Sequence, residues 1–217
     1  MDTLGFYDGD PEGYFDATYN VDLSETRRRF LSHLPSGARI LDLGCGSCRD
    51  AEAFMEAGFD VVPVDASEGM RRVVKDRLGM DVVPMRFDEI PYMNEFDGVW
   101  ASASLLHVPS AELPSILGLI RRALKDGGVF FCSFKTGDYE GERDGRRYTD
   151  MTPGRLTSLL SSSGFSVIDV WQDEDHRGTV WTNTISMFQK EDNLTVKTGA
   201  SNLFKNTDER DGYTRAT

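Results

Sequence analysis

Arg39-Ile-Leu-Asp-Leu-Gly-Cys-Gly-Ser-Cys-Arg-Asp50 runs from an apolar, strand-like segment through a glycine turn into a helix-like segment. The next apolar run, Val61-Val-Pro-Val64, ends at a single acid, Asp65. In open α/β sheets this order of strand, glycine turn, helix, strand and acid forms a nucleoside-binding half. The glycines let the backbone approach the ligand, and the acid accepts hydrogen bonds from ribose hydroxyls. The stretch therefore predicts a cofactor that contains a nucleoside.

The spacing of the glycines separates two classes of cofactor. A dinucleotide-binding fold has Gly or Ala at the third position of G-x-G-x-x-G, where the helix packs closely on the strand. That position is Arg49 here, and an acid, Asp42, precedes Gly44 and Gly46. An acid there repels a pyrophosphate but attracts a ligand with an ammonium and a sulfonium group. The spacing favours S-adenosylmethionine (SAM) over a nicotinamide dinucleotide.

Five segments together resemble the class I SAM-dependent methyltransferases, in particular the small bacterial enzymes similar to tellurite-resistance methyltransferases. The resemblance implies SAM as the cofactor and a methyl transfer to a small-molecule acceptor. The chain departs from the family at Cys48, where a third glycine is common, so we expect a slightly wider loop there. The five segments are Ile40-Leu-Asp-Leu-Gly-Cys-Gly-Ser47, Val64-Asp65-Ala-Ser67, Phe96-Asp97-Gly-Val-Trp100, Leu105-Leu-His-Val108 and Leu124-Lys-Asp-Gly-Gly-Val129.

Composition and charge limit the class of protein. The chain has 217 residues, 39% of them hydrophobic, which is ordinary for one sizeable globular core. Its net charge of −12 disfavours unaided binding to a nucleic-acid backbone. No apolar run approaches the roughly 18 residues of a membrane span, and the acidic start Met1-Asp-Thr-Leu lacks the basic end of a signal peptide. We expect a cytoplasmic protein, monomeric or dimeric.

The cysteines do not indicate a metal or a disulfide framework. There are 3 cysteines, Cys45, Cys48 and Cys132, and 3 scattered histidines. Cys45-Gly-Ser-Cys48 has C-x-x-C spacing, but no second cysteine pair lies near it in the sequence. We expect small residues packed in a cofactor loop and no metal, although oxidation of the pair could distort the loop.

Seven candidate strands alternate with helices, which predicts an α/β fold with a Rossmann-like, doubly wound, mostly parallel sheet. The resemblance adds that the last strand is antiparallel and inserted between the fifth and the sixth. Helices are expected from Ser24, over 51–57 with Phe54 and Met55 inward, over 69–78, from Leu113 until Gly127-Gly128, and from Thr152 to Gly164. The strands are 39–43, 61–64, 82–86, 97–102, 128–134, 166–171 and 180–189.

The chain divides into three parts by composition. Residues 1–37 contain several aromatic residues and are expected to form a helical cap, and residues 38–189 hold the predicted SAM-binding fold. Residues 190–217 are polar with few apolar residues, and we interpret them as a mobile tail. An alternative is a segment that docks on a partner through Leu203-Phe204.

Cofactor-binding residues are easier to predict than catalytic ones, because the SAM methyl group is already activated and the protein mainly has to align the reactants. Asp42 is expected to orient the methionine ammonium, and Asp65 to accept both ribose hydroxyls. Phe87 is a candidate wall for the adenine, and Asp88 a candidate acceptor for its amine, with a plain surface acid as the alternative. The predicted set is Tyr19, Asp42, Gly44, Cys45, Gly46, Asp65, Ala66, Ser67, Met70, Phe87, Asp88 and Ala101.

The acceptor side offers fewer motifs. Ala101-Ser-Ala-Ser-Leu-Leu-His107 follows the fourth strand and lacks the Asn/Asp-Pro-Pro-Tyr/Phe motif of enzymes that methylate amino groups of bases or of glutamine. His107 is the candidate catalytic base for a hydroxyl acceptor, with a packed, non-catalytic histidine as the alternative. The density of arginines after the fifth strand suggests an anionic acceptor. The predicted acceptor-binding residues are Tyr14, Lys135, Arg146 and Arg177.

A second interpretation is a SAM-binding protein without methyltransferase activity, either a regulator or an enzyme of another SAM chemistry. It stays open because the sequence shows no obligatory catalytic pair.

Overall fold

The computed structural model of the protein describes residues 3–189. The predicted tail, residues 190–217, and the alternative docking segment Leu203-Phe204 lie outside the described residues.

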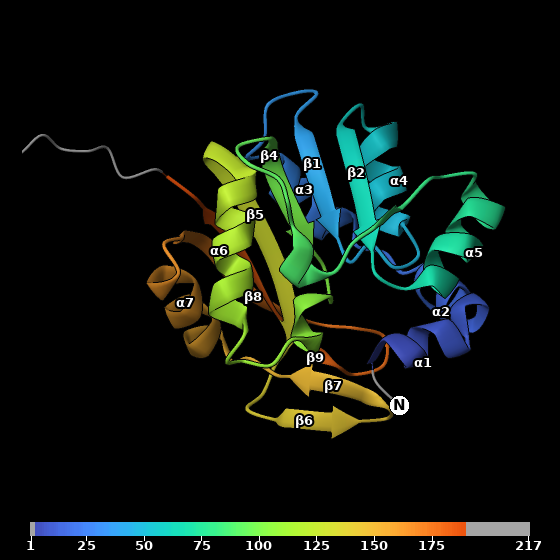
Figure 1. Ribbon diagram of the computed structural model, residues 1–217. Helices are drawn as coiled ribbons and strands as arrows, with labels where there is room; N and C mark the ends of the chain where they lie inside the picture. The colour runs from blue at the N-terminus through green and yellow to red at the C-terminus, as the bar shows by residue number, and fades with distance from the viewer. Residues whose placement is uncertain (1–2, 190–217) are drawn as a thin grey trace, which may run out of the picture.

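A seven-stranded sheet with the order β3-β2-β1-β4-β5-β9-β8 forms the centre of the molecule (Figure 1). β1 to β5 pair in parallel, whereas β9 runs antiparallel to both β5 and β8. The predicted Rossmann-like sheet, with the last strand antiparallel and inserted between the fifth and sixth, is confirmed. The strands are β1 Arg39–Leu43, β2 Asp60–Asp65, β3 Val83–Pro84, β4 Phe96–Ala101, β5 Leu124–Lys135, β8 Ser166–Glu174 and β9 Val180–Met187.

Helices cover both faces of the sheet, and each face has its own apolar core. On one face, α6 and α7 pack against Phe130 and Phe134 of β5. On the other face, α3, α4 and α5 pack around Trp100 of β4, which stacks on Phe131 with 3.9 Å between ring centroids. The helices are α3 Ser24–Leu31, α4 Arg49–Glu56, α5 Glu68–Leu78, α6 Leu113–Ala123 and α7 Pro153–Ser162, with short turns η1 Phe87–Glu89 and η2 Leu105–His107.

Three local predictions were wrong. α6 ends at Ala123, not at Gly127-Gly128, because Leu124 adopts an extended backbone, is buried and pairs with Phe96 of β4. The third strand covers 83–84 instead of 82–86. Met55 is 37% exposed, since the inward face of α4 is occupied by Ala51 and Phe54.

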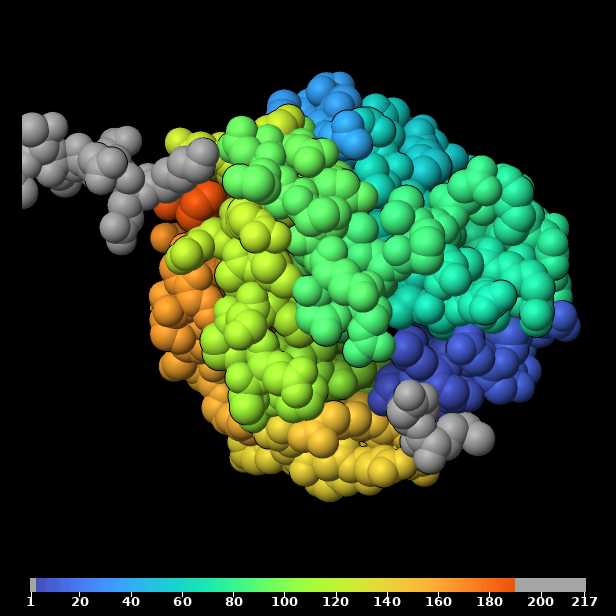
Figure 2. Space-filling model, in the orientation of Figure 1, coloured from blue at the N-terminus to red at the C-terminus, as the bar shows by residue number. Residues whose placement is uncertain are grey.

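The first two helices of the described chain, α1 Thr3–Gly9 and α2 Pro11–Thr18, lie beside α5 and below the sheet edge in Figure 1. The carboxylate of Asp8 anchors α1 to the beginning of α5. It accepts hydrogen bonds from Ser67 Oγ at 2.6 Å and from the Gly69 amide at 2.9 Å. In Figure 2 the surface of this segment, in blue, borders those of α5 and of the yellow hairpin described next.

The sequence analysis missed a hairpin, β6 Glu140–Arg143 and β7 Arg146–Thr149. Asp144-Gly145 forms its turn, and both residues have positive φ angles of 52° and 74°. This geometry belongs to a two-residue type I′ turn, for which Asp-Gly is a preferred sequence. β7 contacts α1, and the Arg147 amide donates to Thr3 Oγ1 at 3.1 Å. The hairpin and α1 therefore meet below the sheet edge.

Candidate functional site

A cavity of about 1350 Å³ lies at the edge of the sheet where β1, β2, β4 and β5 end and β9 begins. Its lining comes from the glycine loop after β1, from α1 and α2, from the beginning of α3, from η2 and from the hairpin. Ligands of open α/β sheets bind in this position, outside the carboxyl ends of the strands.

Position 44, in the loop after β1, accommodates only glycine. Its φ angle is +77°, and an added Cβ atom would lie 2.6 Å from Cβ of Ser104 and 3.2 Å from the Phe87 ring. The amides of Gly44 and Cys45 both donate to the Val64 carbonyl, at 2.9 and 3.0 Å. These bonds join the loop to the end of β2 and leave its inner side open to the cavity.

Asp65 links this loop to β2. Its Oδ2 accepts from the Gly46 amide at 2.9 Å, and its Oδ1 accepts from the Ser67 amide at 2.8 Å. Burial raises the pKa of Asp65, and the two backbone hydrogen bonds oppose this shift. Each carboxylate oxygen has a further lone pair and the residue lines the cavity, so Asp65 can accept two ligand hydroxyls.

Asp42 is a buried acid with an unsatisfied oxygen. It is 3% exposed, and its Oδ2 has no hydrogen-bond partner within residues 3–189. Burial, and then the charge of Asp50, raises the pKa of Asp42. Asp50 itself is paired with Arg27 and Arg49, both at 2.7 Å. A buried carboxylate without its own cation fits the ammonium of SAM, because burying an unpaired charge is costly.

Two apolar side chains of the cavity were predicted to contact the adenine. Met70 is 1% exposed, the Phe87 ring lies over the glycine loop, and both line the cavity. Asp88 also lines it, but its side chain is 66% exposed and pairs with Arg86 at 3.3 Å. An open Asp65, an unsatisfied Asp42 and this apolar wall together fit SAM.

Three of the predicted cofactor-binding residues do not line the cavity. Tyr19 stacks on Phe15 and donates to Glu52 outside it. Ser67 caps α5, and Ala101 is fully buried, so the next residue of the chain, Ser102, lines the cavity in its place.

His107 lines the cavity and uses both ring nitrogens in hydrogen bonds. Nδ1 is 2.7 Å from the Arg147 carbonyl oxygen, and Nε2 is 2.7 Å from the Tyr7 hydroxyl. A carbonyl only accepts, so Nδ1 carries the proton and Nε2 accepts from Tyr7. Burial lowers the pKa of His107 to about 4, and the charges of Arg146 and Lys135 add to the effect. The imidazole is therefore neutral at pH 7.

Three cations surround the ring of Tyr148. Lys135 Nζ lies 4.3 Å, Arg143 Cζ 4.6 Å and Arg146 Cζ 5.3 Å from its centroid. Arg143 is neutralised by Asp150 at 2.8 Å. Neither Lys135 nor Arg146 forms an ion pair with any residue of the described chain, and Arg146 Nε is buried without a partner. The cavity therefore has two unneutralised cations beside His107.

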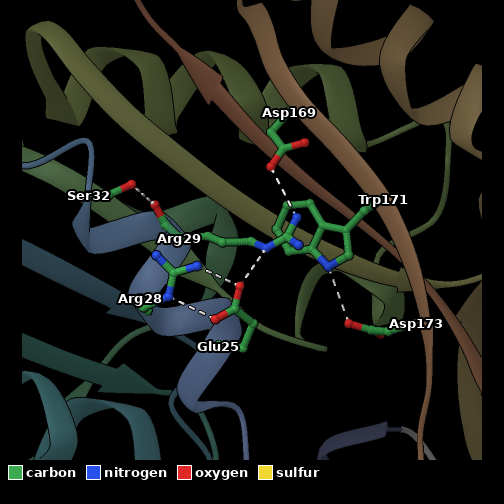
Figure 3. Close-up of polar contacts among 7 residues, drawn as sticks. All are labelled: Glu25, Arg28, Arg29, Ser32, Asp169, Trp171 and Asp173. Atoms are coloured by element: carbon green, nitrogen blue, oxygen red, sulfur yellow. Dashed lines mark hydrogen bonds and ion pairs between the residues drawn. The ribbon is translucent and has the colours of Figure 1, made fainter.

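The side of the cavity formed by β8 and β9 is lined by aromatic rings. Two of its acids already accept hydrogen bonds from these rings. Figure 3 shows Arg29 of α3 over the ring of Trp171 and its contact with Asp169. Arg29 Cζ lies 4.8 Å from the ring centroid, and Nη1 lies 3.4 Å from Asp169 Oδ2. The indoles of Trp171 and Trp181 donate to Asp173 and Asp175, at 3.3 and 3.0 Å. Arg177, predicted to bind the acceptor, lies exposed on this rim.

Tyr7 is a cavity residue that the sequence analysis missed. It lies on α1 and contacts Tyr14, with 4.8 Å between ring centroids, and it donates to His107. The aromatic content of residues 1–37 was the available signal, but it does not say which ring meets the cavity. Ser104 and Ser133 also line the cavity without having been predicted.

The two loop cysteines are free thiols with 3.3 Å between their sulfur atoms. Cys48 has a φ angle of +58°, which explains why a glycine suits this position. Within residues 3–189, no group of three or more His, Cys, Asp or Glu side chains could hold a metal ion. None of the helices in the same range is long and apolar enough to cross a bilayer.

Comparison with known proteins agrees with this geometry. Residues 41–132 match the model of a methyltransferase domain. An uncharacterised methyltransferase of Staphylococcus carnosus is 28% identical over 73% of this chain and 82% of its own length. A demethylmenaquinone methyltransferase of Clavibacter sepedonicus is 32% identical, and the match covers 64% of this chain and 62% of the relative.

A solved structure has the same fold. It is the 1,6-didemethyltoxoflavin-N1-methyltransferase of Burkholderia thailandensis, with 1,6-didemethyltoxoflavin and S-adenosylhomocysteine bound. The two structures superpose with a TM-score of 0.70 at 23% identity, over 85% of this chain and 84% of the other.

Proposed function

This chain is a class I SAM-dependent methyltransferase, and on that premise we propose that it methylates a small molecule with an anionic group. The observation that supports the acceptor class is the pair of unneutralised cations, Lys135 and Arg146, beside His107. A partly buried arginine with an unused N–H fits a carboxylate or phosphate, because charge-assisted hydrogen bonds to such groups are strong.

The size of the cavity supports a small acceptor next to the cofactor. Small-molecule sites commonly measure about 300–1,000 Å³, and this cavity of about 1350 Å³ is large enough for two ligands. The 1,6-didemethyltoxoflavin bound to the Burkholderia enzyme is a small molecule held together with a cofactor product in the same fold. The similarity to tellurite-resistance methyltransferases, the absence of a nucleic-acid substrate and a cytoplasmic location stay predictions.

The roles of the residues follow from their positions. Bound SAM would supply an activated methyl group, and the electron pair of the carbon–sulfur bond would leave with its sulfur atom. Asp65 would hold the ribose and Asp42 the ammonium, which fixes the orientation of the methyl group. Tyr7, Tyr14 and Tyr148 line the cavity and would enclose the reacting atoms. The protein thus aligns the reactants and limits access of water, which is the main requirement of this reaction.

A test of the acceptor class uses Arg146→Gln and purified full-length protein with radiolabelled SAM. Acceptors are screened as matched pairs with and without a carboxylate, such as 3,4-dihydroxybenzoate and catechol. Loss of one charged hydrogen bond costs about 1.5–3 kcal/mol, so the apparent KM for the carboxylated member should rise roughly 10- to 100-fold. The affinity for S-adenosylhomocysteine should not change.

Arg28→Gln is the matched control, because Arg28 is exposed on α3 and forms an ion pair with Glu25. The anionic-acceptor proposal fails if Arg146→Gln behaves like Arg28→Gln. A protein that binds S-adenosylhomocysteine yet methylates none of a broad acceptor panel would instead favour the SAM-binding alternative.

A further inference from the structure

Tyr7 and His107 form a hydrogen-bonded chain at the acceptor side of the cavity. Tyr7 comes from α1 and His107 from η2, and both line the cavity. The Tyr7 hydroxyl donates to Nε2 of His107, and Nδ1 donates to the Arg147 carbonyl. Both nitrogens are occupied, so an acceptor hydroxyl cannot reach the basic nitrogen directly. The group bonded to this nitrogen is the Tyr7 hydroxyl, and Tyr7 lines the cavity.

We propose that Tyr7 and His107 are a proton relay for a hydroxyl acceptor, in which Tyr7 Oη takes the acceptor proton while its own proton passes to His107 Nε2. This rests on the proposed function, and it specifies oxygen as the methylated atom. The acceptor O–H bond breaks, and its electron pair forms the bond to the transferred methyl group. The proton ends on His107, so the positive charge of the sulfonium is replaced by that of an imidazolium.

The surroundings of His107 connect the relay to the anionic acceptor. The charged or titratable groups that face it are Tyr7 of α1, Tyr14 of α2, Lys135 of β5, and Arg146 and Tyr148 of β7. Arg146 and Lys135 are the cations among them, and they oppose protonation of the imidazole. An acceptor anion bound between them cancels this repulsion. The histidine therefore becomes a better base when the substrate is in place.

The burial of Tyr7 is consistent with its role in the proton relay. Burial and the neighbouring Tyr14 raise the pKa of Tyr7, while a hydrogen bond from Arg146 opposes this. Tyr7 thus stays protonated and has a proton to pass on. Its phenol oxygen can accept from a substrate hydroxyl while it donates to His107, because a phenol is both a donor and an acceptor. Tyr7 is the catalytic residue in this scheme, and His107 acts through it.

The first experiment needs no turnover. Full-length protein labelled with ¹⁵N-histidine and saturated with S-adenosylhomocysteine is titrated by NMR, with and without benzoate as an anionic probe. We expect a neutral His107 protonated on Nδ1, and a pKa that rises from about 4 toward its ordinary value when benzoate binds. Arg146→Gln should remove most of this response. A neutral ring protonated on Nε2 overturns the relay, whatever the acceptor is.

The second experiment measures the methylation kinetics of variants with three acceptors, namely 3,4-dihydroxybenzoate, catechol and 4-aminobenzoate. Tyr7→Phe and His107→Gln should lower kcat for hydroxyl methylation by about 10²- to 10⁴-fold, the usual share of acid–base catalysis. Their Kd for S-adenosylhomocysteine should stay within about twofold. Glutamine at position 107 can accept a hydrogen bond from Tyr7 but cannot take its proton. The variant therefore distinguishes a role of His107 in proton transfer from a role in packing. Tyr139→Phe is the control, since Tyr139 is 42% exposed and outside the cavity lining.

The outcomes separate this inference from the proposed function. Methylation of catechol alone, with the same loss in both variants, supports the relay and refutes the anionic acceptor. Methylation of the carboxylated probes with kcat unchanged in Tyr7→Phe overturns the relay and retains the anionic acceptor.

Discussion

The amide of Gly46 donates a hydrogen bond of 2.9 Å to Oδ2 of Asp65, which lies 19 positions further along the chain. This bond joins the glycine loop after β1 to the acid that ends β2. It fixes the carboxylate at the cavity and leaves lone pairs for a ligand. The predicted cofactor half of the site therefore lies on two adjacent parallel strands and their loops.

Asp65→Ala should weaken the binding of S-adenosylhomocysteine by about 1.5–3 kcal/mol, the range for hydrogen bonds to a charged group, because the ribose hydroxyls lose their acceptor. Isothermal titration calorimetry measures this change. Asp60→Ala is the matched control, as Asp60 begins the same strand and is exposed. If the two variants bind S-adenosylhomocysteine with equal affinity, Asp65 does not contact the cofactor.

Gly44→Ala should abolish cofactor binding and destabilise the fold. An alanine would need a left-handed backbone at φ +77° and would place its Cβ 2.6 Å from Ser104. Gly58→Ala separates the backbone strain from the steric clash. Gly58 also has a left-handed backbone, at φ +87°, but there is open space around it. That control should lose only about 1–2 kcal/mol of stability and keep its affinity. Denaturant unfolding and calorimetry together test this, and equal behaviour of both variants contradicts the account of the loop.

Asp8→Ala should loosen α1 over the cavity, since Asp8 accepts from both Ser67 and Gly69 at the beginning of α5. We expect faster release of S-adenosylhomocysteine and faster amide exchange over residues 3–9. Asp16→Ala is the control, because Asp16 is exposed on α2 and forms a long ion pair of 3.8 Å with Arg77. Stopped-flow release rates that match in both variants would show that Asp8 does not hold the segment closed.

Acid should destabilise the protein partly through His107. In the unfolded chain a histidine binds its proton near pH 6.5, whereas burial lowers the pKa of His107 to about 4 in the folded protein. Between these values the unfolded state binds more protons, so the free energy of unfolding decreases as the pH falls, by up to about 1.4 kcal/mol per pH unit. Denaturant titrations of the parent and of His107→Gln should show a shallower decrease in the variant. Parallel pH curves would contradict the lowered pKa.

The sequence was sufficient for features that are local or that belong to one strand and its loop. The order of glycines and acids from Asp42 to Asp65 predicted the loop, because strand, turn and acid follow one another in the chain. The arginines of the segment after β5 were also found, although their arrangement as a hairpin was not. The Asp144-Gly145 turn carried that information.

Features that depend on long-range packing could not be predicted in the same way. Tyr7 meets His107 across 100 positions of sequence, and only the docking of α1 on α5 and β7 brings them together. Tyr19 is aromatic like Tyr14 and lies in the same segment, but its ring stacks on Phe15 outside the cavity. Periodicity identifies a helix, but it does not decide which of its rings points to a cavity formed by other elements.

A crystal structure of the full chain with S-adenosylhomocysteine and 3,4-dihydroxybenzoate tests the central claim most directly. The account predicts ribose hydroxyls on Asp65, the amino group on Asp42, and the benzoate carboxylate between Lys135 and Arg146. A nucleoside bound away from Asp65, or a carboxylate that leaves Lys135 and Arg146 without a ligand, would contradict it.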